Sequence, residues 1–152
     1  MKLAEALVLR ADVQKRLAQV AKRAVDQARF QEGEEPVEDA NELIAEHTRL
    51  SSELEHLIVQ INEQNLRTEM APGLTMTAAL ARRDVLVQQH RFITDVADAA
   101  SRGQDRYAKT EIRYLPAVNV RAIRKQADEL ARQIRELDTS IQAVNWMTEL
   151  DA

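Results

Sequence analysis

Apolar residues recur every three or four positions near the end of the chain, between Val120 and Trp146. They are Val120, Ile123, Ala127, Leu130, Ile134, Leu137, Ile141 and Val144. This unbroken alternation is the heptad spacing of a helix that packs lengthwise against other helices. We therefore expect a long helix with one apolar face, approached closely at the small Ala127. We expect Trp146 to cap the end of the bundle or to contact a neighbouring subunit.

The pattern predicts three further helices. They run from Leu3 to Phe30, from Asp39 to Asn65–Thr68, and from Thr75 or Thr77 to Ala100. The second has its own apolar face, made of Leu43, His47, Leu50, Leu54, Leu57 and Ile61. We expect Asp39 and Glu42 to form a capping box at its start and Asn119 to cap the last helix.

Helix-breaking residues separate these helices. Gly33 should stop the first helix and Pro36 should prevent its resumption. They lie in the acidic stretch 31–38, which lacks the ligand offsets of a calcium loop and is better interpreted as solvated. Pro72-Gly73 ends the second helix. The segment 104–118 is the least helical part, and Pro116 favours extended backbone before it.

Two sequence patterns occur twice. Leu50-x3-Leu54-x2-Leu57-x3-Ile61-x3-Asn65 returns 80 positions later as Leu130-x3-Ile134-x2-Leu137-x3-Ile141-x3-Asn145, and Ala6-Leu7-x2-Arg10 returns 73 positions later as Ala79-Leu80-x2-Arg83. Two explanations fit both repeats: a duplicated helical hairpin, supported by the matching Asn65 and Asn145, and the chance alignment of two heptad helices. The prediction is one all-α domain over residues 1–152: an antiparallel four-helix bundle of two repeated hairpins, with an irregular or short extended connector between helices 3 and 4.

Composition narrows the function classes. Apolar residues make up 45% of the 152 residues, aromatic residues only 3%, and there are three glycines, three prolines and no cysteine. Disulfides and zinc thiolate sites are thereby excluded. A net charge of −4 argues against nonspecific nucleic-acid binding. With neither a signal peptide nor an apolar run long enough to span a membrane, we expect a cytoplasmic protein.

Several polar residues are candidates for chemistry or for packing. Glu53-x-x-His56 has the spacing of diiron bundles, but the repeat-related Gln133 and Glu136 of the last helix supply no second histidine, so we predict no metal site. His47 and His90 lie near apolar faces. A catalytic or pH-sensing role is less favoured for them than partial burial with one hydrogen bond.

The repeat-related Arg10 and Arg83 also lie near apolar faces, close to Asp12 and Asp84. We interpret these residues as ion pairs that fix the register of the bundle, in preference to catalytic groups.

The connector before the last helix is the best candidate for a ligand site. Its cationic and aromatic residues are Arg102, Arg106, Tyr107, Lys109, Arg113 and Tyr114. Arginines there are suited to a phosphate or another small anion. The competing and favoured interpretation is a structured loop whose tyrosines pack on helix ends or on a neighbouring subunit. We predict no catalytic residue and no cofactor.

The chain also resembles the septicolysin-like family of small bacterial helical proteins. The resemblance rests on Leu3-Ala-Glu-Ala-Leu7 with Arg10 and Asp12, Gln31-Glu-Gly-Glu-Glu-Pro36, Ala79-Leu-Ala-Arg-Arg-Asp84, Asp105-Arg-Tyr107 with Glu111-Ile112, and Gln126-Ala-Asp-Glu-Leu130 through Arg135-Glu-Leu-Asp138 to Asn145-Trp146. It spans nearly the whole chain. The family label implies a pore-forming cytolysin but supplies no binding or catalytic residues.

Three functions follow as hypotheses. The first is a non-enzymatic, self-associating helical protein, because the apolar run Ala6–Leu9 is too wide for one packing face and calls for a further partner. The second is the pore-forming cytolysin that the resemblance implies. Only this hypothesis places the protein at a membrane. The third is a binder of a small anion at the connector.

Overall fold

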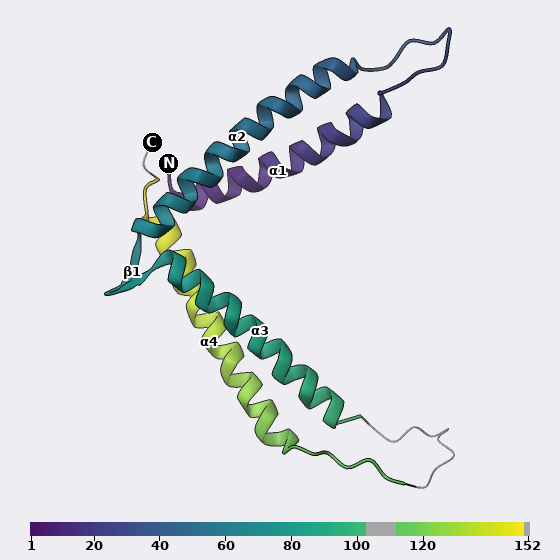
Figure 1. The fold of residues 1–152 in the computed structure, drawn as a ribbon. Helices are drawn as coiled ribbons and strands as arrows, with labels where there is room; N and C mark the ends of the chain where they lie inside the picture. Colours follow the sequence, from purple (N-terminus) through teal and green to yellow (C-terminus); the bar gives the residue numbers. More distant parts are fainter. Residues whose placement is uncertain (103–111, 151–152) are drawn as a thin grey trace. The chain divides into compact units, whose positions relative to one another are not determined.

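The chain folds into four long helices in a computed structural model that describes residues 1–102 and 112–150 (Figure 1). The helices are α1 (Leu3–Asp26), α2 (Ala40–Arg67), α3 (Met76–Ala100) and α4 (Val120–Met147). Within the described residues the only sheet is a two-stranded hairpin of β1 (Glu69–Ala71) and β2 (Leu74–Thr75). The predicted all-α class is confirmed.

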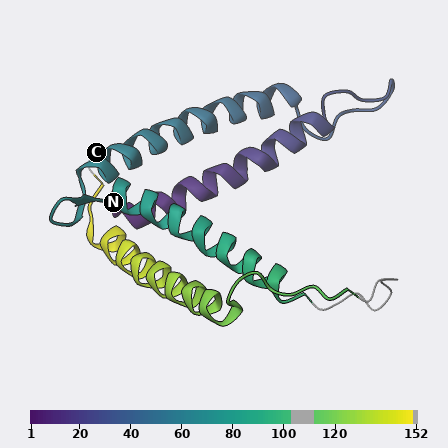
Figure 2. The same ribbon diagram turned by 60° about the horizontal axis from the view of Figure 1, so that its bottom comes forward.

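The chain divides into two compact units. The first comprises residues 1–69 with 143–152, and the second comprises residues 70–142. In the first unit α1 and α2 lie side by side and antiparallel, and in the second α3 lies beside α4 in the same way (Figures 1 and 2). Each of the two predicted helical hairpins is therefore present.

The core of the first hairpin runs between the facing apolar stripes of α1 and α2. Its buried residues are Val13, Val20, Leu43, Leu50 and Leu57, with Leu9, Leu17, Ala24 and Leu54 packed against them. Full burial of one such side chain contributes about 1.5–3 kcal/mol. Because Leu50 is completely buried, the stripe predicted for the second helix is the main apolar face of this hairpin.

The two ends of the chain close the first unit together. The Leu3 amide donates to the Thr148 carbonyl at 2.9 Å, and the Leu150 amide donates to the Met1 carbonyl at 2.8 Å. Leu150 then packs with Leu3, Ala6 and Ile61 in a second apolar cluster. These contacts cover the start of α1, including the part of the Ala6–Leu9 run that points inward.

The heptad positions of α4 form its buried face as predicted, and Leu137 among them lines a groove with Leu86 of α3. All eight are at least partly buried, and Ala127 and Ile141 are almost completely so, at 8% and 1% exposed. Trp146 is 57% exposed, so its indole does not pack into the end of the bundle. A contact of Trp146 with a neighbouring subunit stays a prediction.

Side-chain caps fix where three helices begin. Asp39 accepts from the Asn41 amide at 2.7 Å, Thr75 from the Ala78 amide at 3.2 Å, and Asn119 from the Ala122 amide at 3.1 Å. These bonds satisfy amides that have no partner within their own helix. The predicted caps at Asp39 and Asn119 are confirmed, and Thr75 rather than Thr77 starts the third helix; the capping box predicted for Asp39 is only half formed, because Glu42 does not accept from the Asp39 amide.

The end of the first helix was predicted too late. α1 ends at Asp26, four residues before Phe30, and Gly33 lies within the following loop at a φ of +92°. The Gln27 side-chain carbonyl accepts from the Val37 amide at 3.2 Å, a bond across the loop that requires the helix to have stopped. α2 ends at Arg67, within the predicted range, and Pro72-Gly73 forms the tight turn between β1 and β2.

The helix boundaries repeat the duplication found in the sequence. α2 and α4 are both 28 residues long, and their first and last residues are 80 positions apart (40 to 120 and 67 to 147). Pro36 and Pro116 keep the same offset in the loops before them. α1 and α3 begin at Leu3 and Met76, 73 positions apart, and both side chains are fully buried.

Candidate functional site

The predicted ligand site at the connector is described only in part. Arg106, Tyr107 and Lys109 lie outside the described residues. Arg102 and Tyr114 line a pocket of about 630 Å³ between the end of α3 and residues 114–118, whereas Arg113 does not. The Tyr114 ring is 91% exposed, so it stands at the rim of the pocket.

The polar residues predicted to fix register behave differently in the two hairpins. The Arg83 guanidinium lies 3.0 Å from Asp84 Oδ1 and 3.8 Å from Asp138 Oδ1 on α4, so this arginine does link the second hairpin. The predicted pair of Arg10 with Asp12 is not formed within the described residues. Asp12 is exposed, and the buried Nε of Arg10 has no hydrogen-bond partner.

The three histidines lie apart from one another along their helices. His47 is half-buried, with the Ser51 hydroxyl 3.4 Å from its Nδ1 atom. His90 is half-buried on α3, and His56 is exposed on α2. Across residues 1–102 and 112–150, no three acidic or histidine side chains gather in a way that could hold a metal ion.

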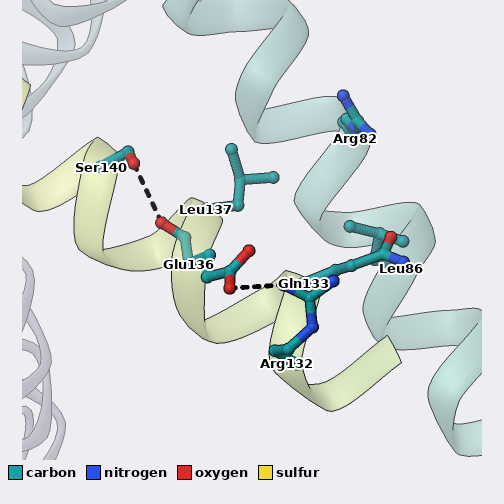
Figure 3. A pocket seen from close by; sticks show the side chains of 7 residues that line it. All are labelled: Arg82, Leu86, Arg132, Gln133, Glu136, Leu137 and Ser140. Carbon is teal, nitrogen blue, oxygen red and sulfur yellow. Dashed lines mark hydrogen bonds and ion pairs between the residues drawn. The ribbon is translucent and has the colours of Figure 1, made fainter. Parts of the chain in front are cut away.

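A shallow groove runs between α3 and α4. Arg82 and Leu86 line it from α3, and Arg132, Gln133, Glu136, Leu137 and Ser140 line it from α4, around a volume of about 350 Å³ (Figure 3). No signal in the sequence singled out this groove, because all of its α4 residues except the heptad residue Leu137 are polar positions beside the heptad face, which the pattern predicts to be solvent-exposed.

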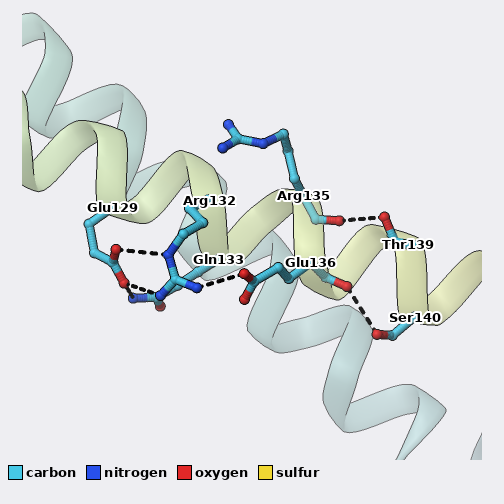
Figure 4. Close-up of polar contacts among 7 residues, drawn as sticks. All are labelled: Glu129, Arg132, Gln133, Arg135, Glu136, Thr139 and Ser140. Carbon is cyan, nitrogen blue, oxygen red and sulfur yellow. Dashed lines mark hydrogen bonds and ion pairs between the residues drawn. The ribbon is translucent and has the colours of Figure 1, made fainter.

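Beside the groove, one arginine holds two carboxylates. Arg132 donates to both oxygens of Glu129, at 2.6 and 3.0 Å, and to Glu136 at 2.6 Å, and Gln133 donates to Glu129 at 3.0 Å (Figure 4). The hydrogen bonds from Arg132 and then from Gln133 lower the pKa of Glu129 to about 2. Arg135 points away from this cluster, which is a paired, solvent-exposed network with no free base or nucleophile.

This network predicts a pH-dependent contribution to stability. The pKa of Glu129 is lower in the folded chain than its ordinary value of 4.5, so its stabilising effect is complete above 4.5 and is lost as the pH falls through about 2. Glu129→Gln should lower the melting temperature slightly at neutral pH, and the difference from the wild type should vanish on acidification. Asp128→Asn, at an adjacent exposed carboxylate outside the network, is the control; a gap that persists at pH 2 contradicts the assignment.

The third helix carries a second apolar stripe, whose middle is exposed to solvent within the described residues, whereas its end at Val96 and Ala99 lines the pocket with residues 114–118. The stripe consists of Ala78, Ala81, Val85, Gln88, Phe92, Val96 and Ala99, spaced by three or four residues. Phe92 is 65% exposed and Val85 is 52% exposed. At the repeat-related positions α1 has Glu5, Val8, Asp12, Lys15, Gln19, Arg23 and Asp26. The two copies of the hairpin therefore differ on this face, which is polar in the first and apolar in the second.

Sequence reasoning missed this stripe although the signal was present. The apolar positions expected to face inward define one face per helix, and Val85 and Phe92 fall outside that face on α3. Their own spacing of seven residues places them on one line along the helix. Of the Ala6–Leu9 run, which first suggested association, only Val8 is left well exposed, at 67%.

No helix in the described residues combines the length and apolar character needed to cross a membrane. No curated protein matches the chain. A solved structure does, titled "Crystal structure of a functionally unknown conserved protein from Corynebacterium diphtheriae". It is 39% identical, the match covers 99% of both chains, and the TM-score is 0.95.

A family model extends the match to a group of sequences. It covers residues 10–150, from Arg10 of α1 to Leu150. The chain therefore belongs to DUF6847, a family of unknown function.

Proposed function

We propose that the protein is a non-enzymatic helical scaffold that self-associates through the second apolar stripe of α3. The exposure of Val85 and Phe92 on that stripe carries the proposal. Contiguous apolar surface of this kind marks interaction sites in soluble proteins. The repeat-related face of α1 is polar, so the apolar character of the α3 face is not required by the hairpin fold and supports a separate role in binding.

A second copy of the chain fits this stripe because its pattern is symmetric about its centre. Read from either end, the sequence of residue types is nearly the same: Ala78 matches Ala99, Ala81 matches Val96, Val85 matches Phe92, and Gln88 matches Gln89. Two antiparallel α3 helices related by a twofold axis bring these residues opposite each other. Such a contact is isologous and closes at two copies.

Sedimentation analysis of matched variants tests the contact. Val85→Glu and Phe92→Glu should each abolish association through α3, because a charge would be buried at the centre of this interface. Val87→Glu is the control. It introduces the same change two positions away, about 200° around the helix, at a residue 47% exposed. A wild-type chain that sediments as a monomer at high concentration contradicts the proposal.

Cysteine cross-linking then tests the antiparallel arrangement, since the natural chain has no cysteine. Gln88→Cys lies near the twofold axis and should form a disulfide between two copies, whereas Val87→Cys should not. Ala78→Cys and Ala99→Cys should cross-link only when the two variants are mixed. Cross-linking of Ala78→Cys with itself would indicate a parallel pairing instead.

An alternative function is the binding of a small anion beside Arg102. The guanidinium of Arg102 lines the pocket of about 630 Å³ together with Tyr114, and arginine is suited to phosphate recognition. Inorganic phosphate and phosphorylated metabolites should then raise the melting temperature of the wild type and not that of Arg102→Ala. Equal melting temperatures with and without these ligands argue against binding.

A further inference from the structure

The tip of the first hairpin contains an apolar pocket with an acidic rim. Ala24, Phe30, Pro36, Val37 and Ile44 contribute apolar atoms to this pocket, whose volume is about 710 Å³. Phe30, Val37 and Ile44 are 63%, 88% and 57% exposed. This volume is within the range of about 300–1,000 Å³ that is usual for binding pockets.

The loop that bounds this pocket has carboxylates without an ion pair in the described residues, and one of them, Glu35, lines the pocket. The loop 27–39 has five acidic residues and only one basic residue, Arg29. Glu38 is paired with Arg23, which lowers the pKa of this carboxyl, and Asp39 caps α2. Glu32, Glu34 and Glu35 form no ion pair within the described residues. This pocket and its loop are named the acidic tip.

The end of the second hairpin has the complementary character. Ile112, Tyr114 and Leu115 are 76%, 91% and 80% exposed, and Arg113 lies among them. Arg102 is also exposed and forms no ion pair with a described residue, and residues 112–118 contain no acidic side chain. Arg102 and residues 112–118 are named the basic tip.

We propose that the basic tip of one copy docks into the acidic tip of another. Tyr114 and Leu115 supply apolar side chains for the pocket, and Arg102 and Arg113 face the unpaired carboxylates of the loop, Glu35 at the pocket among them. Complementary charge of this kind steers association and selects the partner. The inference rests on the proposed self-association, but it uses both hairpin ends and neither Val85 nor Phe92 of the α3 stripe.

A tip-to-tip contact joins two different surfaces, so it is heterologous. In a bound pair one copy keeps a free acidic tip and the other keeps a free basic tip, so the assembly can grow beyond two copies. Because the charges are exposed, the contact should weaken as salt shortens the screening length from about 10 Å at 0.1 M to about 3 Å at 1 M. The apolar α3 contact should be far less sensitive to salt.

Complementation of two variants tests the tips in a background that removes the α3 contact. Both variants carry Val85→Glu. One also carries Phe30→Lys, which disables the acidic tip, and the other carries Leu115→Glu, which disables the basic tip. Alone, each should sediment as a monomer. Mixed in equal amounts, they retain one compatible pair of tips and should form a species of twice the monomer mass.

The controls separate this inference from the proposed function. The control for Phe30→Lys is Leu66→Glu in the same Val85→Glu background. Leu66 lies on α2, is 62% exposed and belongs to neither tip, so Leu66→Glu should leave association through the tips unchanged. A mixture that stays monomeric overturns the tip contact, as does dimerisation of either variant alone. Failure of the α3 contact is seen separately, as association unaltered by Val85→Glu without any tip substitution.

Discussion

Leu50→Ala is expected to lower the free energy of unfolding of the first unit by about 2–5 kcal/mol. Leu50 is 0% exposed and lies in the middle of the cluster formed by Val13, Val20, Leu43 and Leu57. The substitution removes buried methyl groups and leaves a cavity that two long packed helices can close only in part. Urea unfolding followed by circular dichroism measures the loss.

Two other leucines calibrate that effect. Leu66→Ala changes the same side chain where it is 62% exposed and should alter the stability by no more than about 0.5 kcal/mol. Leu130 occupies the repeat-related position on α4 and is only half-buried, so Leu130→Ala should fall between the two. A loss at Leu50 no larger than the loss at Leu66 contradicts the assigned core.

The helices could be predicted well because local chemistry determines them. Asp39, Thr75 and Asn119 each satisfy a first-turn amide, and the heptads of α2 and α4 show which face is buried. The end of α1 could not be predicted, because it depends on a bond between the Gln27 side chain and the Val37 amide across the loop.

Contacts between distant parts of the chain were less predictable. Lys2 and Glu149 are 147 positions apart, yet Lys2 Nζ lies 2.5 Å from Glu149 Oε1 beside the paired termini. No periodicity links two short segments that meet only after the helices have formed. The β1–β2 hairpin was missed for a related reason: its strands have three and two residues, too few to show alternation.

In the candidate site, too, local features could be predicted from the sequence and contacts between segments could not. Residue types at the connector indicated a cationic surface, and Arg102 does line a pocket there. The groove beside Arg132 and the acidic tip could not be predicted from the pattern of any single helix. Each is bounded by two segments, and packing determines how these segments align. The α3 stripe was accessible to sequence reasoning, since Val85 and Phe92 are seven positions apart on a single helix.

Arg10→Met and Arg83→Met are expected to change stability in opposite directions. The Nε atom of Arg10 is buried without a partner, and a polar group left in this state costs about 1–3 kcal/mol. Methionine keeps an unbranched apolar side chain and removes that atom, so Arg10→Met should stabilise the first unit by about 1 kcal/mol. Arg83 donates to Asp84 and approaches Asp138, so Arg83→Met should cost up to about 1 kcal/mol.

The duplication explains the difference and supplies the decisive control. The position equivalent to Asp138, 80 residues earlier, is Ile58, so α2 offers Arg10 no carboxylate where α4 offers one to Arg83. Ile58 is 36% exposed, which leaves room for a polar side chain. Ile58→Asp should therefore cost less with Arg10 present than in the Arg10→Met background, a coupling that a double-mutant cycle measures directly. A coupling energy of zero would contradict this explanation. The Nε atom of Arg10 would then lack a partner because of how α1 packs, and not because position 58 lacks the carboxylate found at Asp138.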